Sequence, residues 1–163
     1  MKVIIPVFKN CVSASVVGMM DMLTLTENFY HHLPLQKKKW FRVELVSLTE
    51  EKKVNNNGFE ITCDVTLSEC EAADLVIIPA MVGDFASLIN EHAIFIDWLK
   101  IQYEKGTVLC STCSGSFFLA ATGHLDGKEA TTSWFASAAF RAMFPRVKLM
   151  DEKIIVDNGK SIT

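Results

Sequence analysis

Apolar residues along this chain form patterns typical of strands and patterns typical of helices. One strand pattern is the short continuous apolar run, which is typical of a strand buried on both faces of a parallel sheet. The other strand pattern alternates apolar with polar residues and predicts a strand with one face covered. The predicted strands are Val3–Phe8, Trp40–Ser47, Asp74–Pro79 and Val108–Cys110.

The other pattern places apolar residues three and four positions apart, which predicts helices between the strands. The first predicted helix begins at Ser13 or Ser15 and runs toward Phe29. Three more are predicted over Phe85–Ile89, His92–Tyr103 and Ser116–Ala121, and a last one ends at Met143, before Phe144-Pro145. Strands that alternate with helices predict an α/β fold with a mostly parallel central sheet.

Turn-forming residues predict two further features. Asn55-Asn-Asn-Gly58 predicts a turn before an extended segment over Phe59–Leu67. Asp157-Asn-Gly159 predicts a hairpin whose arms are Lys153–Val156 and Lys160–Thr163. The sequence stops inside the second arm of this hairpin, so we expect it to be a fragment of a longer protein.

Length and composition predict one domain over residues 1–163, since the chain has 163 residues and is 50% hydrophobic. A net charge of -3 argues against nucleic-acid binding by this chain alone, and Lys37-Lys-Lys39 is expected to be a solvated turn. We find no signal peptide and no run long enough to span a membrane, so we expect a cytoplasmic protein. Five irregularly spaced cysteines predict neither a disulfide framework nor a metal site, and nothing indicates a cofactor.

The candidate chemistry centres on Cys113. A predicted strand ends just before Cys113-Ser114-Gly115, and a predicted helix follows at once. This order is typical of a sharp strand-to-helix turn like the nucleophile elbow of hydrolases, and the helix N-terminus would favour the thiolate. In parallel sheets ligands collect at the carboxyl ends of strands, where both Cys113 and Pro79-Ala80 fall.

Several roles remain open for these residues. Cys113 can be a reactive thiol, a pocket residue or an inert relic. A redox pair with Cys110 is disfavoured because Cys110 should point from its strand into the core. Thr131-Thr132-Ser133 can line the pocket floor or only bond the backbone of a turn. Met19, Met20 and Met22 are expected to be mostly core, with part of this face available to a second subunit.

Several stretches carry a family resemblance. They are Ala14–Leu23, Asp74–Pro79, Cys113–Trp134, Phe144-Pro145 and Val156–Thr163. These stretches resemble the ThiJ/PfpI family of the class I glutamine amidotransferase-like superfamily, and more narrowly its branch fused to AraC-type DNA-binding domains. The resemblance implies a three-layer, flavodoxin-like sandwich. It also implies a further helix and a C-terminal helix-turn-helix domain after the hairpin, both absent from this sequence.

The chain departs from the family pattern where catalysis would need partners for Cys113. Ser133 stands where a histidine usually precedes the tryptophan, and Ser15 stands where enzymatic members often carry an acidic residue. Ala80-Met81 replaces the glycine whose N–H often helps to form an oxyanion site. A cysteine without these groups loses general acid–base assistance of about 10²–10⁴-fold.

The resemblance and these departures together predict a non-catalytic, ligand-sensing and dimerisation domain of an AraC-family transcriptional regulator. The expected partners are an unknown small molecule, a second copy of the chain, and DNA through the C-terminal domain. The alternative is a stand-alone cysteine enzyme (hydratase, amidase or glyoxalase-like) or a thiol redox sensor using Cys113. The predicted ligand pocket consists of Ser15, Ala80, Met81, Cys113, Ser114, Ser133 and Trp134.

Overall fold

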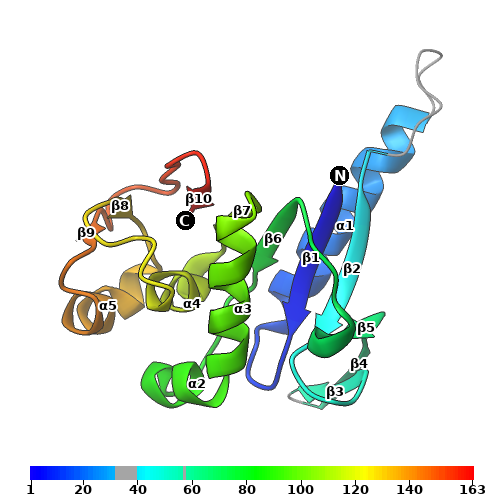
Figure 1. Ribbon diagram of the computed structural model, residues 1–163, viewed down its shortest axis with the longest axis horizontal. Helices are drawn as coiled ribbons and strands as arrows, with labels where there is room; N and C mark the ends of the chain where they lie inside the picture. The colour runs from blue at the N-terminus through cyan, green and yellow to red at the C-terminus, as the bar shows by residue number, and fades with distance from the viewer. Residues whose placement is uncertain (32–39, 57) are drawn as a thin grey trace.

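A parallel six-stranded sheet organises the chain in the computed structural model, which describes residues 1–31, 40–56 and 58–163 (Figure 1). The strand order is β10-β7-β6-β1-β2-β5, and every neighbouring pair is parallel. The predicted α/β fold is therefore confirmed. The strands of this sheet are β1 (Lys2–Val7), β2 (Arg42–Ser47), β5 (Val65–Thr66), β6 (Leu75–Ile78), β7 (Val108–Ser111) and β10 (Ser161–Ile162).

Strand β1 lies at the centre because its residues can be buried on both faces. It pairs with β2 on one side, where Ile5 lies opposite Leu45, and with β6 on the other, where Ile4 lies opposite Val76. From Val3 to Val7 no residue of β1 is exposed. This is the burial that a continuous apolar run predicts for a central parallel strand.

Helices cover both faces of the sheet. Helix α1 (Ser13–His31) contacts β1 and passes behind it in Figure 1, whereas α3 (Ala93–Glu104) and α4 (Ser116–Ala121) contact β7. Helix α2 (Phe85–Glu91) packs against α3 and α4, and α5 (Ser137–Met143) follows near the C-terminus. None of the helices in the described ranges could cross a membrane, because none combines the necessary length with enough apolar residues.

Two small strand pairs lie outside the main sheet. Strands β3 (Lys53–Asn56) and β4 (Phe59–Thr62) form an antiparallel hairpin, and Gly58 takes the positive φ of 86° that its turn needs. Strands β8 (Glu129–Ala130) and β9 (Lys148–Leu149) form a short parallel pair. Short 3₁₀ turns occupy Leu67–Glu69, Cys113–Gly115 and Trp134–Ala136.

The predicted C-terminal hairpin is present only in part. Val156 and Thr163 exchange two backbone hydrogen bonds of 2.9 and 3.0 Å, but residues 153–155 form no strand. The second arm instead becomes β10 and pairs in parallel with β7. The edge of β7 offers unpaired backbone groups to this segment, and pairing there satisfies them.

The methionine face of α1 differs from its prediction. Met20 is 39% exposed and Met22 is 69% exposed, so placing this face mostly in the core was wrong. Only a narrow side of α1 faces the sheet, where Val16 is fully buried and Met19 packs against the core. Lys37–Lys39, predicted to be a solvated turn, lie outside the described residues.

Candidate functional site

The turn at Cys113 has the backbone of a strained elbow. Strand β7 ends at Ser111, a 3₁₀ turn covers Cys113–Gly115, and α4 begins at Ser116. Cys113 has φ of 54°, in the left-handed region that costs a non-glycine residue about 1–3 kcal/mol. Its side chain is exposed. The structure therefore has the sharp strand-to-helix turn that the sequence predicts.

Gly115 allows this elbow to approach the end of β6 closely. A Cβ atom at this position would lie 2.5 Å from the carbonyl oxygen of Pro79 and 2.7 Å from that of Ile78. Both neighbours are backbone atoms, which cannot rotate away as a side chain could. The glycine is thus required by space, and its own backbone lies in the ordinary helical region, with φ of -58°.

The hydroxyl of Ser114 ties the elbow to the loop after β6. It accepts a hydrogen bond from the Met81 N–H at 2.9 Å and donates one to the Met81 carbonyl at 2.6 Å. Ser15, on the first turn of α1, accepts from the Ala80 N–H at 3.2 Å and donates to the Val12 carbonyl at 2.7 Å. The two backbone N–H groups that follow Pro79 are therefore both engaged by serine side chains.

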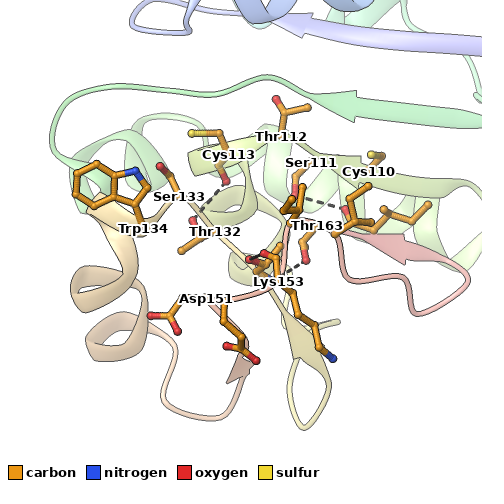
Figure 2. A pocket seen from close by; sticks show the side chains of 15 residues that line it. Cys110, Ser111, Thr112, Cys113, Thr132, Ser133, Trp134, Asp151, Lys153 and Thr163 are labelled. Atoms are coloured by element: carbon orange, nitrogen blue, oxygen red, sulfur yellow. Dashed lines mark hydrogen bonds between the residues drawn. The ribbon is translucent and has the colours of Figure 1, made fainter.

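A pocket of about 550 Å³ opens beside Cys113 (Figure 2). Of the residues predicted to line it, Cys113, Ser133 and Trp134 do so, and Ser15, Ala80, Met81 and Ser114 do not. The last four lie together around the hydrogen bonds that join the elbow to the loop after β6. The pocket is lined by Cys110–Cys113, Thr131–Trp134, Asp151–Ile155, Ile162 and Thr163.

Threonine and serine hydroxyls form the polar part of this pocket. Thr132 donates to the Cys113 carbonyl at 3.4 Å, and the Ser116 hydroxyl lies 2.8 Å from that of Thr132. The Thr163 hydroxyl accepts a hydrogen bond of 2.8 Å from the Thr131 N–H. These contacts hold the wall to the elbow, and they connect residues that are far apart in the sequence.

Two of the three charged side chains that line the pocket are held in ion pairs. Asp151 is paired with Arg141 at 2.9 Å, and the hydrogen bond from this arginine lowers the pKa of the carboxyl. Lys153 is paired with Glu129 at 2.7 Å. No histidine lines the pocket in the described part of the chain, and His124 instead stacks on Tyr103, with the ring centroids 4.0 Å apart. A carboxylate held ionised in this way is a weak general base.

Cys110 does not point into the core, contrary to its prediction. It is half-buried and lines the pocket, on the opposite side from Cys113 in Figure 2. Successive residues of a strand face opposite sides, and Leu109 is fully buried, so Cys110 faces the other side of the sheet. Burial raises the pKa of its thiol.

Sequence reasoning missed the contribution of the C-terminal segment to the pocket. Ile154 is 92% exposed and Ile155 is 67% exposed, and both border the pocket together with Trp134, which is 83% exposed. They form an apolar rim around the opening. The sequence signal that could have indicated this contribution was the predicted C-terminal hairpin, because its second arm needs a strand to pair with. In the residues that the structure describes, no group of three or more potential ligands could hold a metal ion.

Comparison with known proteins identifies a family and several similar proteins. The sequence profile of the DJ-1/PfpI family matches residues 1–163. The HTH-type transcriptional regulator GbdR of Pseudomonas aeruginosa is 31% identical over 126 residues, which are 77% of this chain and 34% of GbdR. This chain therefore spans about a third of the length of that relative.

Two further proteins are similar to this chain. The isonitrile hydratase of Pseudomonas putida is 29% identical over 80 residues, which cover 49% of this chain and 34% of the hydratase. The crystal structure of a candidate transcriptional regulator from Vibrio parahaemolyticus superposes with a TM-score of 0.85 over 99% of this chain and 82% of that chain. Its 18% identity supports the shared fold alone.

Proposed function

Because this chain belongs to the DJ-1/PfpI family, we propose that it is a non-catalytic, ligand-sensing domain of a transcriptional regulator. The observation that carries this proposal is the engagement of the Ala80 and Met81 N–H groups by the hydroxyls of Ser15 and Ser114. A nucleophilic cysteine acting on a carbonyl-like carbon needs free donors for the negative charge that develops. These two donors are already bonded within the protein, which favours binding over turnover.

The ligand that we propose is a small molecule held without a covalent bond beside Cys113. A volume of about 550 Å³ lies within the usual range for small-molecule pockets, about 300–1,000 Å³. The apolar rim of Trp134, Ile154 and Ile155 would cover the body of such a molecule. The hydroxyl groups near Thr132 would bond its polar atoms. No cofactor or metal is part of this proposal.

The regulatory role rests on GbdR, whose name describes a helix-turn-helix transcriptional regulator. We propose that DNA is bound in the cytoplasm by an AraC-type C-terminal domain outside this sequence. The same proposal includes a homodimer formed through α1, whose exposed Met20 and Met22 offer adaptable apolar surface to a second copy.

A thermal-shift screen of this chain against a library of small metabolites tests ligand sensing. A compound present at ten times its Kd should raise the Tm by about 3–6 °C. The shift should persist in Cys113→Ala and disappear in Ser133→Trp, which fills the pocket. Ala139→Trp adds the same side chain at an exposed position of α5 and is the matched control. Shifts that survive Ser133→Trp would contradict this site.

The second candidate function is a cysteine hydratase, favoured by the strained and exposed Cys113 and by the isonitrile hydratase among the relatives. It is tested by incubating the chain with tert-butyl isonitrile and following formation of the N-substituted formamide. We expect no formamide above the level given by Cys113→Ala. Turnover that depends on Cys113 would replace the sensing proposal with the enzymatic one.

A further inference from the structure

A second pocket, of about 390 Å³, lies apart from Cys113 at the carboxyl end of β2. Its walls come from the segment after β2, from the 3₁₀ turn after β5, and from the junction of α2 with α3. It shares no lining residue with the pocket at Cys113. The pocket is lined by Leu48, Thr49, Glu50, Leu67, Ser68, Cys70, Glu91, His92, Ile94, Phe95 and Trp98.

The inner part of this pocket is apolar and rigidly held. Phe95 is buried at its floor and stacks on Trp98, with ring centroids 6.1 Å apart and planes 18° apart. The His92 ring packs edge-on against Phe8 at 5.2 Å and against Phe118 at 5.8 Å. An aromatic floor fixed in this way is organised before a ligand arrives, so little ordering cost falls on binding.

His92 contributes a buried ring to the floor of the pocket. The residue is 8% exposed, and its Nε2 has no hydrogen-bond partner among the described residues. Burial lowers the pKa of its imidazole, which favours the neutral ring with one acceptor nitrogen. The Nε2 atom is closed off from the surface, so the ring adds a packed, neutral edge to the pocket and no hydrogen bond to a ligand.

The rim of the same pocket is negatively charged. Glu50 and Glu91 both stand at its exposed edge, and no lysine or arginine lines it. Neither carboxylate forms an ion pair within the described ranges. The side chain of Trp98 is half-buried and adds an aromatic face, which attracts cations through its ring quadrupole. Anions are repelled by this arrangement.

We propose that this second pocket binds a small organic amine, with the ammonium group between Glu50 and Glu91 and the apolar body against Phe95 and Trp98. The two rim carboxylates accept hydrogen bonds, and an alkylammonium ion supplies up to three donors. The site is independent of Cys113, so it does not depend on the function proposed above.

The probe for this site is 2-phenylethylamine, compared with 2-phenylethanol and 3-phenylpropionate, which have a similar apolar body with a neutral or anionic head. Binding is followed in ¹⁵N-labelled chain by the indole N–H signals of its three tryptophans. We expect the amine to move the Trp98 signal with a Kd of about 1 mM. The alcohol should bind more weakly, and the propionate weakest.

Removing the two rim charges isolates the electrostatic part of the proposal. Glu50→Gln with Glu91→Gln should weaken the amine about five- to twentyfold and leave the affinity of the alcohol unchanged. Both positions are exposed, so the variant should keep the wild-type urea midpoint. Glu104→Gln is the control, because Glu104 is exposed at the end of α3 and lines neither pocket, and it should leave the affinity for the amine unchanged. Equal binding of the propionate would overturn the proposal. So would movement of the Trp134 signal alone, or an equal loss of affinity in Glu104→Gln.

Discussion

Gly115→Ala is the substitution that most directly tests the close contact between the elbow and β6. The added Cβ would lie 2.5 Å from the Pro79 carbonyl oxygen and 2.7 Å from that of Ile78. An ordinary contact begins near 3.4 Å, so the elbow and the strand end must separate by about 0.9 Å. The Ile78 carbonyl also accepts the Thr112 N–H at 2.9 Å, and this bond would be stretched.

The expected cost follows from overpacking a closely packed interior, which destabilises proteins by about 1–3 kcal/mol. For a chain of this length, each kcal/mol lowers Tm by about 2–4 °C. Gly115→Ala should therefore lower the midpoint of thermal unfolding by about 2–12 °C, measured by circular dichroism at 222 nm. The contact that holds Met81 to Ser114 should also loosen, which would weaken any ligand bound beside Cys113.

Gly18→Ala is the matched control. Gly18 lies in α1, and a Cβ atom there would meet nothing within 4 Å. Alanine in a helix interior is favoured over glycine by about 0.5–1 kcal/mol, so this variant should equal or exceed the wild type in stability. The steric argument is refuted if Gly115→Ala keeps the wild-type Tm, or if both variants lose the same amount.

Three further predictions concern buried polar groups and thiols. Ser114→Ala leaves the N–H and the carbonyl of Met81 without partners, so it should lower the free energy of unfolding in urea by about 2–4 kcal/mol. Ser133→Ala should change this free energy by no more than about 0.5 kcal/mol, and equal effects of the two variants would contradict the assignment. Burial lowers the pKa of His92 from its ordinary 6.5, so wild-type stability should fall as pH drops below about 6.5, and His92→Phe should flatten this part of the profile of urea midpoint against pH. In native protein a thiol reagent such as DTNB should react fast with the exposed Cys113 and slowly with the other four cysteines, because burial raises the pKa of their thiols. Cys113→Ser should abolish the fast phase, and a fast phase that survives would place the reactive thiol elsewhere.

Much of the fold could be predicted because the signals were local. The continuous run that became β6 and the strand–cysteine–helix order at β7 and α4 both depend on residues adjacent in sequence. The exposed methionines of α1 could not be predicted in this way. Apolar spacing shows that a helix has an apolar side, but the width of the buried strip depends on what lies opposite.

Only part of the predicted ligand pocket coincides with the pocket in the structure. Cys113, Ser133 and Trp134 line it, whereas Ser15, Ala80, Met81 and Ser114 do not. Asp151 and Lys153 reach the pocket through the β8–β9 pair and the hydrogen bond from Thr131 to the Lys153 carbonyl, and Ile162 reaches it because β10 pairs with β7. The strand edge with which a short segment pairs depends on contacts with residues distant in sequence, so the segment's own apolar pattern does not predict it.

The sequence by itself determined the order of strands and helices along the chain, the elbow at Cys113, and the serines at positions 15 and 133. These features depend on side-chain type and on spacing along a few turns or strand residues. Only the tertiary structure decided that Ser15 and Ser114 engage the N–H groups of Ala80 and Met81, because the two serines lie on different elements, 99 positions apart in sequence. Whether a backbone donor is free for chemistry depends on which distant hydroxyl the fold brings to it.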